Sequence, residues 1–151
     1  PVASDLRFVF SATRVSAELE RIGDHAKNIC RSLQLMRNKA NTKPIATVRK
    51  MAEIVVSMLK DAMLAFVRRD SSLANATIAG DEIVDALNDK VIDEMLHEDL
   101  VNRSIDAPVD LAAAMAQILL GRSLERIGDQ TTNICEEVVY MVKGDDIRHR
   151  T

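Results

Sequence analysis

The sequence is poor in aromatic residues and in the residues that form turns. Aromatic residues make up 3% of the chain, Trp is absent, and only 5 Gly and 3 Pro occur among 151 residues. A fold made of many short strands needs frequent turns, so this shortage argues against a β-sandwich or a barrel. The core must be filled by Leu, Ile, Val, Met and Ala, a mixture that suits packed helices.

The sequence also lacks an excess of positive charge and any long apolar run. Its net charge is −3 and its pI is about 5.6, so we expect no nucleic-acid binding, which depends on a basic surface. The longest nearly apolar stretch, 111–120, is too short to span a bilayer. The first residues have neither the basic start nor the apolar block of a signal peptide, so we expect a cytoplasmic protein. Because no initiator Met is present, we expect that the natural N-terminus lies further upstream.

Four long helices are predicted from apolar residues that recur at helical spacing. They cover about residues 5–38, 44–68, 73–100 and 109–142, with Thr42 as a cap for the second helix. Helices of this length joined by short turns form bundles. The predicted fold is therefore an all-α antiparallel bundle of long helices.

An internal repeat links the first and the fourth predicted helices. The segment Leu19–Asp24 reappears as Leu124–Asp129, and Asn28-Ile29-Cys30 reappears as Asn133-Ile134-Cys135. Nine of twelve aligned positions are identical at a constant offset of 105 (125 − 20), so the two helices are equivalent parts of a duplicated unit. The two cysteines occupy equivalent positions, and we expect both to be buried, reduced thiols.

Both copies of the repeat carry polar side chains at positions i, i+4 and i+8, which share one face of a helix. The third predicted helix carries the same pattern with Asp81, Asp85 and Asp89. If the third and fourth helices pack together, their carboxylates meet and form a hard, oxygen-rich site for a divalent or trivalent cation. The candidate metal ligands are Glu20, Asp24, Asp81, Asp85, Glu125, Asp129 and Asn133.

A glycine separates the two carboxylates in each copy, at Gly23 and Gly128. Like charges at i and i+4 repel by a few tenths of a kcal/mol, and glycine inside a helix costs about 1 kcal/mol relative to alanine. Because both costs occur twice, we expect them to serve a function, with the glycine allowing a neighbouring helix or ligand to approach closely.

With these motifs in place, the sequence resembles the PhoU family of phosphate-uptake regulators along essentially its whole length. The family's Glu/Asp-x-x-x-Asp motif is matched by Leu19–Asp24 with His25, by Leu124–Asp129, and by the companion pair Asp81 and Asp85. The resemblance implies tandem three-helix bundles with multinuclear metal clusters, most often of iron, with zinc, nickel or manganese as other candidates. It also implies an adaptor that restrains the phosphate-starvation response, together with the phosphate ABC transporter and its sensor histidine kinase, at the cytoplasmic face of the inner membrane.

The resemblance divides the chain into 1–40, the last helix of a first repeat; 43–143, a complete second three-helix repeat; and 144–151, a tail. Two departures from the family pattern follow. Gln130 replaces the usual His after the second motif, and Glu20 and Asp24 lack the acidic helix that would complete their site. The uncovered apolar face of the first helix is a reason to expect a homodimer.

Several other interpretations stay open at this point. A carboxylate-bridged di-iron enzyme or iron store uses Glu-x-x-His motifs, of which Glu94 and His97 provide a single copy. A histidine phosphotransfer domain would need His-x-x-Lys-Gly, which His25 does not begin. If the acidic stripes bind no metal, they are solvated helix faces. Arg21 and Arg126 either form salt bridges or contact a partner or an anion. No catalytic triad or phosphate-cradling loop occurs, and we expect no enzyme.

Overall fold

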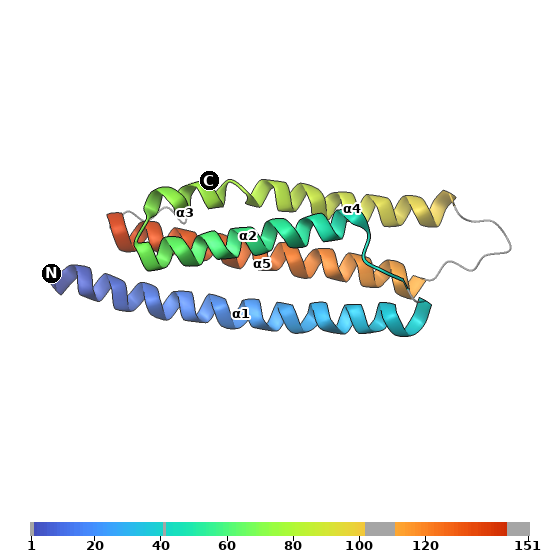
Figure 1. Cartoon of the computed structure of the whole chain (residues 1–151), viewed down its shortest axis with the longest axis horizontal. Helices are drawn as coiled ribbons and strands as arrows, with labels where there is room; N and C mark the ends of the chain where they lie inside the picture. The colour runs from blue at the N-terminus through green and yellow to red at the C-terminus, as the bar shows by residue number, and fades with distance from the viewer. Residues whose placement is uncertain (1, 41, 102–110, 145–151) are drawn as a thin grey trace.

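The computed structural model describes residues 2–40, 42–101 and 111–144, and it consists of helices packed along one long axis (Figure 1). The helices are α1 (Val2–Ala40), α2 (Ala46–Arg68), α3 (Ser71–Ile78), α4 (Asp81–Val101) and α5 (Leu111–Lys143). Consecutive long helices run in opposite directions, and the described residues include no strand. The predicted all-α antiparallel bundle is therefore confirmed. No described helix is both long enough and apolar enough to cross a membrane.

The third predicted helix is not continuous, so the prediction of one helix over 73–100 is wrong. Asp70 caps α3 by accepting hydrogen bonds from the backbone N–H groups of Ser72 and Leu73. The helix then breaks before Gly80, where a Cβ atom would lie 3.0 Å from the Met58 sulfur and 3.3 Å from a backbone oxygen. Glycine fits this contact with α2, and it is also a poor helix former. The break makes Asp81 the first residue of α4.

The start of α2 also differs from the prediction. Thr42 does not cap it; the Thr42 hydroxyl donates to the carbonyl of Met36, while Ile45 holds the N-cap position without a side-chain cap. Gln117 of α5 instead holds the segment before α2, because its Oε1 accepts from the Ile45 N–H at 3.2 Å and its Nε2 donates to the Lys43 carbonyl. The end of α5 agrees with the prediction, with Gly144 following at a φ of 73°.

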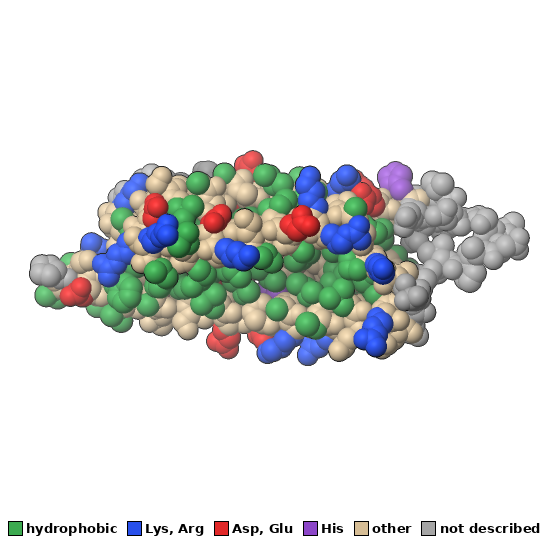
Figure 2. Space-filling view, in the orientation of Figure 1, with side chains coloured by type: hydrophobic (Ala, Val, Ile, Leu, Met, Phe, Trp, Pro, Cys, Tyr) green, Lys and Arg blue, Asp and Glu red, His purple; other side chains and the backbone are tan. Residues whose placement is uncertain are grey.

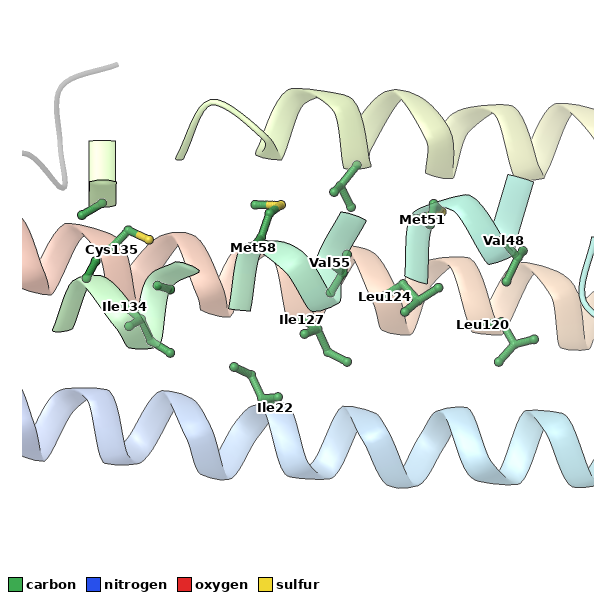
Figure 3. Close-up of a cluster of buried hydrophobic side chains, with 14 of the residues drawn as sticks. Ile22, Val48, Met51, Val55, Met58, Leu120, Leu124, Ile127, Ile134 and Cys135 are labelled. Carbon is green, nitrogen blue, oxygen red and sulfur yellow. The ribbon is translucent and has the colours of Figure 1, made fainter. Parts of the chain in front are cut away.

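The core lies where α5 meets α2, α3 and α4, and it is aliphatic as the composition requires. Fully buried side chains include Met51, Val55, Val84, Val91, Leu120, Ile134 and Val138. Figure 3 shows several of these side chains gathered along α2 and α5, with Leu120 and Ile134 pointing toward α1. Helix α1 flanks this bundle, packing chiefly along α5. The predicted division into residues 1–40 and 43–143 as parts of two repeats stays a prediction.

Helix α1 meets α5 through a narrow heptad-like seam. Its buried and half-buried positions recur with spacings of four and three residues at Ser11, Val15, Glu18, Ile22, His25, Ile29, Ser32 and Met36. At the middle of the seam Ile22 points toward its own repeat counterpart, Ile127 (Figure 3). The two copies of the repeat, one in α1 and one in α5, are therefore related by an approximate twofold axis between two antiparallel helices.

Large apolar side chains on α1 remain exposed outside this seam. Leu6, Val9 and Phe10 are 61%, 59% and 58% exposed, and Leu19 and Leu33 are also exposed. Figure 2 shows hydrophobic side chains gathered in a band where α1 meets the rest of the bundle. This agrees with the sequence-based expectation that α1 presents an uncovered apolar face, and such a face favours association.

Candidate metal centre

Three aspartates from two helices come together at the start of α4. Asp81 and Asp85 occupy the first two turns of α4, and Asp129 lies opposite them on α5. One carboxylate oxygen from each lies within 4.8 Å of the others. The spacing i, i+4 places the first two on one face of α4, as the sequence predicts.

Gly128 lies where α4 packs against α5. A Cβ atom at Gly128 would lie 3.4 Å from Val84 Cγ1 and 3.6 Å from Asp81 Oδ1, which is ordinary van der Waals contact. A methyl group would therefore fit at this position, and only a larger side chain would press against α4. The expected contact of this glycine with a neighbouring helix is seen in the second copy of the repeat, but it does not require glycine.

Burial and mutual repulsion make the negative charge of this group unfavourable. The pKa of Asp81 is raised by its burial and by the neighbouring charges of Asp85 and Asp129. The pKa of Asp129 is raised by its burial, by Glu125 and by Asp85, and Arg126 and His25 act weakly in the opposite direction. Both carboxyl groups therefore hold a proton more tightly in the folded protein than in the unfolded chain.

The three side chains fit a bound cation. Asp81 Oδ1 is buried and has no hydrogen-bond partner among the described residues, so an oxygen lone pair faces the group unsatisfied. The Thr132 hydroxyl lies near enough to lower the pKa of Asp81 slightly, although it makes no hydrogen bond of good geometry with it. Hard cations prefer carboxylate oxygens, and a positive charge here would offset the repulsion. The acidic pattern did not point to Thr132, although its place three residues after Asp129 puts it on the same face of α5.

The other candidates on α5 lie outside this close group. Glu125 is half-buried next to Asp129, close enough to raise the Asp129 pKa but not among the three oxygens within 4.8 Å. Asn133 lies instead along the seam with α1, where its Nδ2 donates to Glu18 Oε2 at 3.4 Å. The Oε1 atom of Gln130 is buried without a hydrogen-bond partner in the described part of the chain.

The first copy of the motif is not assembled in the same way. Glu20 and Asp24 are exposed on α1, and Asp24 pairs with Lys27 at 2.9 Å. That hydrogen bond and the Lys27 charge lower the pKa of Asp24, opposite to the shift of its counterpart Asp129. No atom lies within 4 Å of a Cβ built on Gly23. In residues 2–40, 42–101 and 111–144, no further group of three acidic, histidine or cysteine side chains forms such a cluster.

The cysteines and the Glu-x-x-His pair show where the sequence-based expectations hold and where they fail. Cys135 is buried, which raises its pKa to about 12, but Cys30 is exposed, because its face of α1 lies outside the seam. The expectation of two buried thiols is therefore wrong for Cys30. Glu94 accepts from the Thr47 hydroxyl, and His97 contacts the carbonyl of Asp93 in its own helix. The di-iron alternative gains no support from these contacts.

The raised pKa values of Asp81 and Asp129 predict how the stability of metal-free protein changes with pH. The pKa values of the two carboxyl groups in the folded protein exceed the ordinary 3.8, so their contribution to stability is fully present below pH 3.8. This contribution is lost as the pH rises through the raised pKa values. We expect the urea midpoint of the wild type to fall over this interval relative to that of an Asp81→Asn, Asp129→Asn double variant. A constant difference between the two proteins across the interval would contradict the shifts.

Comparison with known proteins shows which family the chain matches. Residues 1–33 and 48–138 match the PhoU domain. The chain is similar to the phosphate-specific transport system accessory protein PhoU homologs of Pseudomonas putida and Pseudomonas aeruginosa, with 37% and 36% identity over 150 residues, or 99% of this chain. It is 33% identical over 149 residues to the phosphate-specific transport system accessory protein PhoU of Escherichia coli.

Solved structures agree with the sequence comparison. The crystal structure of PhoU from Pseudomonas aeruginosa superposes with a TM-score of 0.85 at 34% identity, covering 96% of this chain and 68% of that one. The crystal structure of the phosphate transport system regulatory protein PhoU from Streptococcus pneumoniae gives 0.84 at 29% identity, covering 95% and 66%. The chain spans 57% and 60% of the two Pseudomonas relatives, so it corresponds to about three fifths of their length.

Proposed function

Because the chain belongs to the PhoU family, we propose that it regulates phosphate transport as a metal-carrying adaptor without a catalytic step of its own. The observation that carries this proposal is the convergence of Asp81, Asp85 and Asp129 at the junction of α4 and α5. An adaptor needs a fixed surface, and a cation bound there would cross-link two helices and neutralise a repulsive group.

Iron is the metal we propose first, in a multinuclear cluster, with zinc, nickel and manganese as the other candidates. The three aspartates would supply the first ligands, and the half-buried Glu125 is near enough to join a second ion. A bound metal would supply positive charge and a rigid link at this site. Glu20 and Asp24 would take part through a second site that requires further acidic residues beside α1. Asn133 belongs to the second copy of the motif, and its amide would have to leave Glu18 to join the metal site.

The proposed partners are the components of the phosphate ABC transporter and its sensor histidine kinase, met at the cytoplasmic side of the inner membrane. Support comes from the Pseudomonas and Escherichia relatives, which are named accessory proteins of the phosphate-specific transport system. The exposed apolar side chains of α1, including Leu6 and Phe10, support association, and we include a homodimer in the proposal.

A retention experiment tests the adaptor and the metal together. Immobilised protein, purified without chelator and analysed for metals by elemental mass spectrometry, is incubated with detergent-solubilised membranes. We expect more than one equivalent of metal and retention of phosphate transporter components by the wild type. The variant with Asp81→Ala and Asp129→Ala should lose both, whereas Asp24→Ala, which changes an exposed carboxylate, should keep both. Retention of no transporter component by any of the proteins would contradict the adaptor role.

A further inference from the structure

A basic cleft lies between α1 and α5, beside the seam and toward the C-terminal half of α1. Its volume is about 350 Å³. It is lined by His25, Asn28, Arg31 and Ser32 of α1 and by Leu119, Arg122, Ser123 and Arg126 of α5. Three guanidinium groups and one imidazole thus surround a single space, and no acidic side chain lines it.

The arginines of this cleft form no ion pair with a carboxylate of the described residues. Within the described part of the chain, Arg31, Arg122 and Arg126 have no carboxylate oxygen within 4.0 Å. Arg31 donates to the Asn28 amide oxygen at 3.1 Å, which orients its guanidinium without removing charge. The Ser123 hydroxyl donates to a backbone carbonyl of its own helix, which leaves its oxygen able to accept.

A second cleft, of about 430 Å³, lies further along the same seam and provides an internal comparison. Its lining residues are Arg14, Ala17, Glu18, Arg21, Asn133, Glu136 and Glu137. Each of these differs by 105 in number from a residue of the basic cleft, which is the offset of the repeat. The duplication therefore builds the same cleft twice, once on each side of the Ile22–Ile127 midpoint.

The two clefts share a shape but not a charge. Arg14 pairs with the buried carboxylate of Glu137 at 2.9 Å, and Arg21 pairs with Glu18 at 2.9 Å, so both arginines of the second cleft are paired with carboxylates. At the counterparts of its three acidic positions the basic cleft carries Arg31, Ser32 and Ser123 instead. If these positions served helix packing alone, both clefts would be expected to carry similar residues, so packing gives no reason for the difference in charge.

From this asymmetry we propose that the basic cleft binds a phosphoryl group, either as free phosphate or on a small organic molecule. Guanidinium groups bind tetrahedral oxyanions with paired N–H donors, and three of them more than offset the charge of a phosphate dianion. A water molecule occupies about 30 Å³, so a cleft of about 350 Å³ has room beyond the five heavy atoms of phosphate. Leu119 adds an apolar wall against which a carbon group could lie. None of the three aspartates lines the cleft, although His25 and Arg126 act electrostatically on Asp129, and the proposal does not require a bound metal.

Matched arginine variants test this cleft against its counterpart. Inorganic phosphate and glycerol phosphate are titrated by calorimetry into chelator-treated protein at physiological salt, because phosphate also coordinates metals. We expect saturable binding near one equivalent, weakened about 10-fold or more by Arg126→Ala. Arg21→Ala, at the equivalent position of the other cleft, should leave the affinity within about twofold of the wild type, the range of an interaction screened by salt.

Arg122→Ala provides a second variant that the fold tolerates, because the other cleft already has Ala17 at this position. Its affinity should fall as that of Arg126→Ala does. Tighter binding of glycerol phosphate would identify a phosphorylated small molecule as the ligand, and tighter binding of inorganic phosphate would identify the free ion. Absence of saturable binding for both probes, or equal weakening by Arg21→Ala and Arg126→Ala, would overturn the proposal.

Discussion

Replacing Asp129 by asparagine is expected to weaken metal binding at least 100-fold without destabilising the metal-free protein. Changes to groups that only support metal ligands cost 10- to 100-fold in affinity, so loss of a proposed direct ligand should cost at least the upper value. The metal-free protein responds differently, because burial, Glu125 and Asp85 all disfavour the Asp129 charge. The amide removes that repulsion while keeping the size of the side chain.

The two effects are measured separately. Competition with a chelating dye gives the affinity for iron, zinc and manganese, and urea unfolding of chelator-treated protein gives the stability. Asp24→Asn is the matched control, since it makes the same change at the exposed counterpart, which pairs with Lys27. If the Asp129→Asn variant retained wild-type metal affinity, or if both variants lost affinity equally, the three-aspartate site would not be the metal centre.

The second large effect is expected from Ile134→Ala, which should lower the free energy of unfolding by about 3 kcal/mol. Ile134 is fully buried on α5, at the seam position equivalent to Ile29 of α1, and its side chain points toward α1 (Figure 3). Its removal leaves a cavity that long, stiff helices cannot collapse to fill, so the loss includes both transfer and cavity contributions.

The repeat again supplies the control, because Ile29 is the counterpart of Ile134 and is only half-buried. Ile29→Ala should cost roughly half as much, since less apolar surface leaves water at that position on folding. Urea denaturation followed by circular dichroism measures both losses. Equal losses in the two variants would mean that α1 is covered as fully as α5.

The fold was predictable from the sequence to the extent that it follows from helical periodicity. The long helices, their antiparallel order and the end of α5 at Gly144 all follow from apolar spacing and a C-cap glycine. The break before Gly80 does not, because it depends on Met58 of another helix pressing against that position. The hydrogen bond from the Ile45 N–H to Gln117 is likewise a contact between residues 72 positions apart.

The candidate site was predictable in part. Helical periodicity gives the face of a helix on which a residue lies, but it does not give which helices pack together. The spacing of Asp81, Asp85 and Asp129 suggested the aspartate group that the structure brings together. It also suggested Asn133, whose amide the structure places near Glu18 on α1. The sequence suggested Arg126 as a contact for a partner or anion, but it did not predict the basic cleft, because Arg31 and Arg122 lie outside the aligned segments. Extending the offset of 105 beyond the motif would have revealed the charge difference.

The two thiols described above form a pair of chemical reporters built into the chain. Cys30 lies on the side of α1 that no described helix covers, while Cys135 holds the equivalent place on α5 beneath the second bundle. A thiol reagent should therefore modify one site per folded molecule, and the second only when the bundle opens. Any partner that covers this side of α1 in the way that α2, α3 and α4 cover α5 would silence the first site. The number of reactive thiols thus counts, without any engineered label, how many faces of the repeat are open.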